Sequence, residues 1–159
     1  MDMRKRQIFP TLQSTEPQAW LDVGRNALVE VTSEEEAYPI ESALLPDENQ
    51  TCGWRAADPG TQIIRVIFDE PQTLRRIWLA FEDTENTRTQ EFVLRWSPSA
   101  GHSFRDIVRQ EWNFSPSGSI REVEDYTVDL PEVAVLELII VPDKAGREGR
   151  ASLRSLRLA

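Results

Sequence analysis

Short runs in which apolar and polar residues alternate are the feature that most constrains how this chain can fold. In residues 62–68, Ile64, Val66 and Phe68 fall on one side of an extended chain and Arg65 falls on the other. This period of two is typical of a β-strand with one buried face. Similar runs, each a candidate strand, recur at residues 27–32, 73–82, 92–97, 104–112, 122–130, 133–141 and 152–158. The sequence therefore predicts an all-β fold.

Turn-forming residues separate these runs. Proline and glycine fall within 58–60, 70–71, 98–101, 116–118, 130–131 and 142–143, and both residue types commonly end strands. About eight short strands joined by such turns favour a two-sheet antiparallel jelly-roll β-sandwich with little helix. Two short helical segments are expected beside it. One starts at Thr15, with Pro17 in its first turn and Ala19 to Val23 following, and the other lies at residues 40–45.

The length and charge of the chain limit its organisation and its partners. The 159 residues fit one domain, placed at residues 20–159 behind an N-terminal extension at 1–19. A net charge of −9 argues against nucleic acid as a partner, because phosphate contacts require a basic surface. One local basic cluster is interpreted as a solvated loop and strand face. It contains Lys144, Arg147, Arg150, Arg154 and Arg157.

Residues suited to catalysis are sparse. His102 is the only histidine, which excludes sites built from several imidazoles. Cys52 is the only cysteine, so no disulfide can form within the chain. The sequence contains neither a G-x-S-x-G nucleophile motif nor a glycine-rich phosphate loop. The sequence therefore predicts a protein that is not an enzyme.

The apolar runs are too short to serve as targeting or anchoring segments. No continuous apolar stretch follows the basic residues at 1–6, as a signal peptide requires, and no stretch approaches the length of a membrane span. We therefore expect a cytoplasmic location and no membrane span.

A series of short motifs runs in a characteristic order from residue 20 onwards. The series comprises LDVG at 21–24, YPIESAL at 38–44, an acidic turn at 47–51 before Gly53-Trp54, a strand ending in Ser97 before Gly101 and Phe104, and Leu153-Arg154 in the last strand.

This order resembles the discoidin family, also called the coagulation factor V/VIII type C family, with its bacterial carbohydrate-binding relatives. The resemblance implies a galactose-binding-domain-like sandwich in which Trp54 packs in the core. Trp78 and Trp96 are also interpreted as packing residues, because they lie within predicted strands. It further implies a ligand site in the loops at one end, for which 33–39, 82–89 and 112–119 are the candidates. Aromatic residues would face a sugar ring and polar residues its hydroxyls. The candidate ligand-binding residues are Tyr38, Asn86, Arg88, Trp112, Asn113 and Phe114.

The resemblance also raises the question of a structural calcium ion, which many bacterial relatives hold near the acidic turn. Calcium takes roughly six to eight oxygen ligands, and Asp47, Glu48, Asn49 and Thr51 could supply several of them. The relatives usually add a glutamate near the C-terminus, whereas the last strand here reads SLRSLRLA and contains no acid. Structural calcium thus stays open beside the alternative of a solvated acidic loop.

Two functions from different classes follow from these observations. The first is a non-catalytic binding domain, with carbohydrate as the leading ligand class by family resemblance. The second is a protein–protein interaction module, or a subunit of a larger intracellular assembly. The absence of a signal peptide motif and of the C-terminal acid favours the second, because glycan-binding domains usually work outside the cell.

Overall fold

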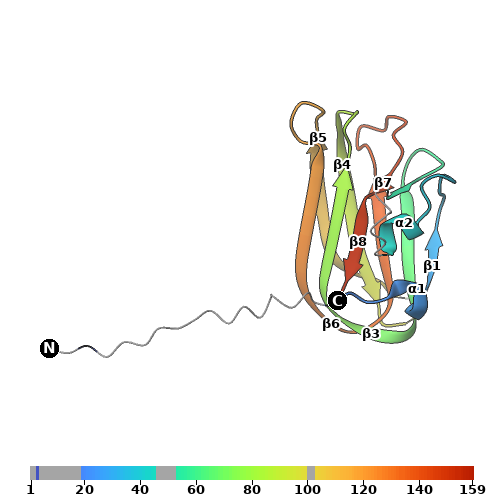
Figure 1. Cartoon of the computed structure of the whole chain (residues 1–159), viewed down its shortest axis with the longest axis vertical. Coiled ribbons are helices and arrows are strands. Elements are labelled where there is room, and N and C mark those ends of the chain that lie inside the picture. Colours follow the sequence, from blue (N-terminus) through green and yellow to red (C-terminus); the bar gives the residue numbers. More distant parts are fainter. Residues whose placement is uncertain (1–2, 4–18, 46–52, 100–102) are drawn as a thin grey trace.

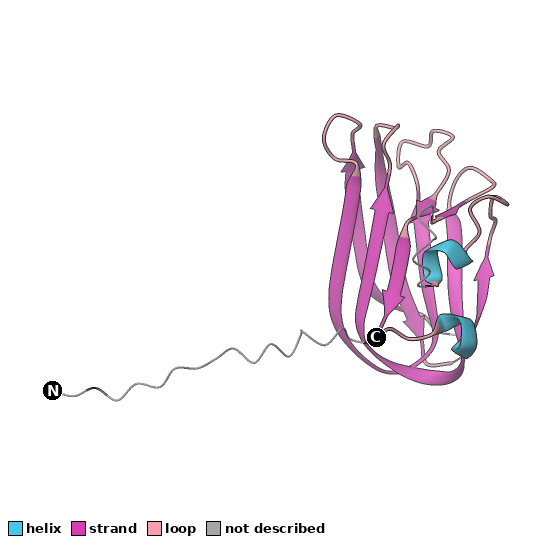
Figure 2. Cartoon of the chain, in the orientation of Figure 1, coloured by secondary structure: helices cyan, strands magenta, loops and turns pink. Residues whose placement is uncertain are grey.

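The computed structural model describes residue 3 and residues 19–45, 53–99 and 103–159. Within these residues, strands dominate and the helices are single turns (Figure 2). None of these helices is long and apolar enough to cross a membrane. The elements are α1 (Val23–Asn26), β1 (Ala27–Val31), α2 (Glu41–Leu44), β2 (Trp54–Arg55), β3 (Gln62–Glu82), β4 (Arg88–Ser97), β5 (Arg105–Phe114), β6 (Arg121–Val141), β7 (Ser152–Leu153) and β8 (Ser155–Leu158).

The strands form two antiparallel layers that share their longest strands. One layer has the order β1-β3-β6-β4-β5 and uses the first part of β3 and the last part of β6. The second layer contains the other parts of β3 and β6, with β8 paired to residues 77–80 of β3. Figure 1 shows β3 and β6 curving at the base of the molecule from one layer into the other. The predicted antiparallel β-sandwich is therefore confirmed.

The bends lie where the sequence places proline, and they correct the predicted strand limits. Segments 62–68 and 73–82 are one strand, as are 122–130 and 133–141. The β3–β6 register shifts between Ile67 and Arg76, beside Pro71 and Pro131. Proline cannot donate to the ladder but keeps an extended backbone. The prolines therefore interrupt pairing and allow each strand to curve without ending it.

Apolar residues from both layers fill the space between the sheets, as the alternation predicts. Ile64, Ile77 and Leu94 are almost completely buried there, and the rings of Phe81 and Phe92 stack with their centroids 5.2 Å apart. Of the tryptophans assigned to packing, Trp54 and Trp96 are buried and Trp78 is half-buried.

A row of charged residues crosses the outer face of the first layer. The carboxylate of Glu137, in β6, is fully buried between two arginines on the neighbouring strands. Arg65 in β3 donates to it from Nε at 2.6 Å, and Arg95 in β4 donates from Nε at 2.9 Å. The register places both arginines directly opposite Glu137. These ion pairs tie three strands together across the sheet.

The helical predictions are confirmed in one case and wrong in the other. The turn predicted at residues 40–45 is α2, and Arg157 in β8 fixes its end by donating from Nη1 to Ala43 O at 2.8 Å. The helix expected from Thr15 through Val23 is absent over residues 19–22, while 15–18 lie outside the described residues. The amide of Leu21 instead donates to Leu158 O at 2.8 Å. This bond to β8 holds the segment extended, and α1 begins only at Val23.

Candidate ligand-binding cleft

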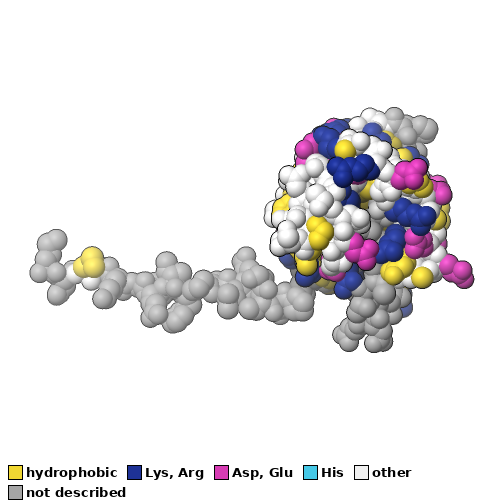
Figure 3. Space-filling view, turned by 90° about the horizontal axis from the view of Figure 1, so that it is seen from above, with side chains coloured by type: hydrophobic (Ala, Val, Ile, Leu, Met, Phe, Trp, Pro, Cys, Tyr) yellow, Lys and Arg dark blue, Asp and Glu magenta, His cyan; other side chains and the backbone are white. Residues whose placement is uncertain are grey.

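A polar cleft of about 520 Å³ opens at the end of the sandwich opposite the bends. It lies among the loops that join β1 to α2, β3 to β4, and β6 to β7 (Figure 1). Figure 3 looks onto this end and shows basic and acidic side chains interspersed over it. The residues that line the cleft are Glu35, Trp54, Arg55, residues 82–88, Asp143, residues 147–150, Ser152, Leu153 and Arg154.

The β3–β4 loop is held in shape by one carboxylate. Asp83 Oδ1 accepts the amides of Glu85 at 2.9 Å and Asn86 at 3.0 Å, which closes a tight turn. Its other oxygen accepts Arg88 Nε at 2.6 Å. Burial alone would raise the pKa of Asp83, but the hydrogen bond from Arg88 and those from the two amides lower it below its usual value. The carboxylate therefore stays ionised and keeps the loop ordered.

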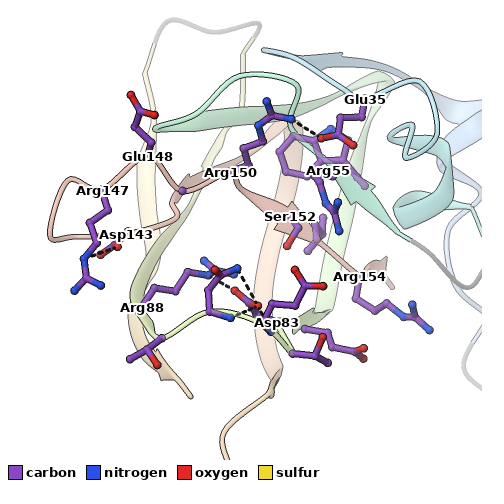
Figure 4. A pocket seen from close by; sticks show the side chains of 18 residues that line it. Glu35, Arg55, Asp83, Arg88, Asp143, Arg147, Glu148, Arg150, Ser152 and Arg154 are labelled. Atoms are coloured by element: carbon purple, nitrogen blue, oxygen red, sulfur yellow. Dashed lines mark hydrogen bonds and ion pairs between the residues drawn. The ribbon is translucent and has the colours of Figure 1, made fainter. Parts of the chain in front are cut away.

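Arg88 forms the floor of the cleft rather than a free contact group. Its side chain is only 6% exposed, and its Nη1 donates to Pro142 O at 2.8 Å and to Gln90 Oε1 at 3.1 Å. Its guanidinium also lies over the ring of Phe114, 4.6 Å from the centroid. These contacts join the β3–β4 loop to β5 and to the end of β6, so Arg88 gives the cleft a rigid base (Figure 4).

One wall of the cleft is the two-stranded ribbon β2–β7. Trp54 pairs with Leu153, and both are buried against the core. Arg55 pairs with Ser152 and so faces the other way, together with Arg154, because side chains alternate along a strand. Figure 4 shows Arg55, Ser152 and Arg154 along the same side of the cleft. The ribbon therefore presents two arginines and a hydroxyl to whatever enters.

Ion pairs across loops shape the rest of the rim. Arg150 Nη1 donates to Glu35 Oε1 at 2.7 Å, which joins the β6–β7 loop to the β1–α2 loop. Arg147 Nε lies 3.5 Å from the buried carboxylate of Asp143. Asp143 Oδ1 also accepts the amide of Ala145 at 2.9 Å. These contacts add to the backbone hydrogen bonds that anchor the β6–β7 loop, such as the one from Lys144 N to Thr89 O at 2.9 Å.

The six predicted ligand-binding residues separate into three groups, which line the cleft, support it or lie away from it. Asn86 and Arg88 line the cleft. Tyr38 lies behind it, with Arg55 over its ring at 4.4 Å from the centroid. Phe114 is buried beneath Arg88. The structure therefore brings Tyr38 and Phe114 to the cleft only as supports for the arginines that line it.

The remaining two candidates lie away from the cleft. Trp112 is half-buried in β5, opposite Gln90, and its buried indole nitrogen has no hydrogen-bond partner within the residues that the structure describes. Asn113 is exposed on the other face of β5 and accepts a hydrogen bond from Thr89 Oγ1 at 2.6 Å. The candidate calcium ligands Asp47, Glu48, Asn49 and Thr51 lie outside the described residues. Among the residues that are described, no cluster of His, Cys, Asp or Glu has the arrangement of a metal site.

Sequence reasoning missed the whole wall formed by β2, β7 and the β6–β7 loop. β2 has only two residues, too few for alternation to be visible. The basic cluster did carry a signal, because Arg147, Arg150 and Arg154 all line the cleft. The interpretation of that cluster as a solvated face overlooked that its residues converge on one concavity.

A buried polar chain leads from the floor of the cleft into the sandwich. Gln90 accepts from Arg88 and donates to Glu122 Oε1 at 3.4 Å, while Glu122 Oε2 is buried with no hydrogen-bond partner among the described residues. Burial raises the pKa of Glu122 from 4.5 to about 8, and a hydrogen bond with Glu124 adds to the effect. Burial, with the charges of Glu124 and Glu122, also raises the pKa of Tyr126. Glu122 therefore carries a proton at neutral pH.

Comparison with known proteins places the fold. No family model matches the sequence, and no curated protein matches it. Among solved structures, CBM32-3 from a family 31 glycoside hydrolase of Clostridium perfringens superposes with a TM-score of 0.63 at 17% identity, over 87% of this chain and 93% of that one. The family 32 carbohydrate-binding module of C. perfringens NanJ, in complex with galactose, gives 0.57 at 19% identity, over 83% and 92%.

A third similar structure comes from a different functional class. Reduced XRCC1 bound to the DNA pol beta catalytic domain superposes with a TM-score of 0.60 at 14% identity, over 85% of this chain and 95% of that one. Together these likenesses define the class: the chain has a galactose-binding-domain-like β-sandwich fold, as the sequence predicts. Within that fold, carbohydrate-binding modules of family 32 are among the structures it is most similar to. At these identities the likeness establishes the fold alone.

Proposed function

We infer that this chain is a non-catalytic carbohydrate-binding domain whose ligand occupies the cleft at the loop end. The observation that carries this proposal is the cleft itself, a concave polar site on a rigid base in a fold shared with carbohydrate-binding modules. Sugar hydroxyls need fixed donors and acceptors, and the cleft offers arginine, carboxylate, amide and hydroxyl groups. Recognition rests on these polar groups because Trp54, the one aromatic residue among those that line the cleft, is 1% exposed.

The alternative, a protein-interaction module, has one observation in its favour, the likeness to XRCC1 bound to DNA pol beta. The described surface does not supply the large apolar patch that commonly marks a docking site. Its exposed large hydrophobic residues are scattered: Met3, Leu28, Ile120 and Val123. Carbohydrate is therefore the better supported ligand class.

A glycan array probed with the intact chain and with two matched variants tests the proposal. Ser152→Trp places a large ring inside the cleft, whereas Ser119→Trp adds the same ring to the β5–β6 loop, outside the cleft lining. We expect the chain to bind a subset of glycans, Ser119→Trp to retain that binding and Ser152→Trp to lose it. Failure to bind any glycan on a broad array would contradict the function. Retention of binding by Ser152→Trp would contradict the site.

A further inference from the structure

The arginines of the cleft differ in what they contact. Three of them have carboxylate partners: Arg88 with Asp83, Arg147 with Asp143, and Arg150 with Glu35. The other two, Arg55 and Arg154, have no ion-pair partner within the described part of the chain, and both come from the β2–β7 ribbon. These two guanidiniums are therefore the positive groups available to a ligand.

The ribbon holds these two arginines in place without neutralising them. Arg55 stacks on Tyr38 at 4.4 Å, which restricts its orientation while leaving its N–H groups open. The amide of Arg154 donates to Ala80 O at 2.9 Å and so fixes the end of the ribbon to β3. Gly53, opposite Arg154, has φ of 69° and no room for a Cβ, which would lie 2.5 Å from Leu153 O. The backbone under Arg154 is therefore tightly specified.

The remaining charged residues of the cleft are carboxylates that form no ion pair with another described residue: Glu82, Glu85 and Glu148. All three are exposed. Glu82 is the last residue of β3, and Glu85 belongs to the β3–β4 loop. They repel a small, uniformly charged anion, but they accept hydrogen bonds from hydroxyl groups. The cleft thus offers guanidinium groups to a carboxylate and carboxylate groups to hydroxyls.

We propose that the cleft selects acidic saccharides of the uronic-acid type, with the sugar carboxylate bound by Arg55 and Arg154 and its hydroxyls directed to the β3–β4 loop. This inference rests on the proposed function and adds the ligand class. Arginine suits the role because its planar fork matches a carboxylate with two parallel hydrogen bonds. Ser152, between the two arginines in the ribbon, supplies a further donor.

Two probes that differ only at C6 give a direct test by isothermal titration. The first is an α-1,4-linked galacturonic acid trisaccharide, and the second is the matching galactose trisaccharide, in which CH₂OH replaces each carboxylate. A charge-assisted hydrogen bond contributes roughly 1.5–3 kcal/mol, so we expect the acidic probe to bind at least about tenfold tighter. Arg55→Gln and Arg154→Gln should each lower its affinity about tenfold, and the double variant should bind both probes equally.

The control is Arg75→Gln, an exposed arginine near the bend of β3, and unchanged melting temperatures show that each variant is folded. Equal or tighter binding of the galactose probe would overturn the inference while supporting the proposed function. An acidic preference that survives in the double variant would overturn the assignment to Arg55 and Arg154. If neither probe bound and a broad glycan array also gave no binding, the proposed function would fall together with the inference.

Discussion

Replacing Glu122 by glutamine should change how the stability of this domain depends on pH. Glu122 lies between the sheets, where one of its carboxylate oxygens has no hydrogen-bond partner in the described part of the chain, and its pKa is raised from 4.5 to about 8. Between these two pH values the folded chain holds a proton on Glu122 that the unfolded chain releases. The free energy of unfolding therefore falls as pH rises from about 4.5 to about 8, and it levels off above the folded value.

The size of the effect follows from the same numbers. The interval from 4.5 to about 8 is about 3.5 pH units, which corresponds to about 5 kcal/mol if Glu122 titrates alone. Glu124, the group that shares its proton, is half-exposed on β6 and can turn towards water. That relaxation reduces the effect, and we expect a fall of about 2 kcal/mol. Glu122→Gln keeps the side-chain shape and the contact to Gln90 but cannot ionise, so its stability should not fall.

Urea unfolding followed by tryptophan fluorescence, at several values between about pH 5 and about pH 8, measures the difference. The free energy of unfolding of Glu122→Gln should equal that of the native chain at the acid end of this range and exceed it by about 2 kcal/mol at the alkaline end. Asp83, Glu91 and Asp125, whose pKa values are lowered, act at lower pH and are common to both proteins. Glu132→Gln, an exposed glutamate at the bend of β6, is the control. If the unfolding free energies of Glu122→Gln and the native chain changed with pH in parallel, the reasoning would be refuted.

Three further predictions concern the framework of the site. Glu137→Gln should lower the unfolding free energy by about 2 kcal/mol, because Arg65 and Arg95 lose their shared partner. Glu30→Gln, which lies opposite Arg65 on β1, should change the unfolding free energy little in the same urea titrations. Asp83→Asn should cost about 1 kcal/mol at neutral pH, measured by chemical unfolding. Since the pKa of Asp83 is lowered, the difference in unfolding free energy should shrink as the pH falls below 3.8, the usual pKa of an aspartate. A difference that grows in acid would contradict the assignment. Gly53→Ala should lower the melting temperature markedly because of its close approach to Leu153 O, whereas Gly118→Ala, which meets open space, should not.

Alternation predicted the layers of the fold but not the continuity of the strands. Pro71 and Pro131 are breakers in sequence, and only tertiary context shows that the chain stays extended through both. The same alternation places Phe114 correctly when it is followed to the end of β5. Gln110, Trp112 and Phe114 share one face, and the register sets Phe114 opposite the buried Arg88. The position of Phe114 beside a loop suggested a ligand contact, whereas its place in the alternating pattern of the strand indicated burial in the core.

The division of the arginines into structural and available ones depends on partners that are distant in sequence, which is why the sequence alone cannot make it. Arg88 and Asp83 are five residues apart, but Arg150 and Glu35 are 115 apart. Arg55 lies in β2 and Arg154 directly follows β7, and these two strands pair across nearly a hundred residues of chain. Only the folded register shows that both line one cleft and form no ion pair with another described residue. A site of this kind is defined less by which residues are charged than by which charges the fold leaves unpaired.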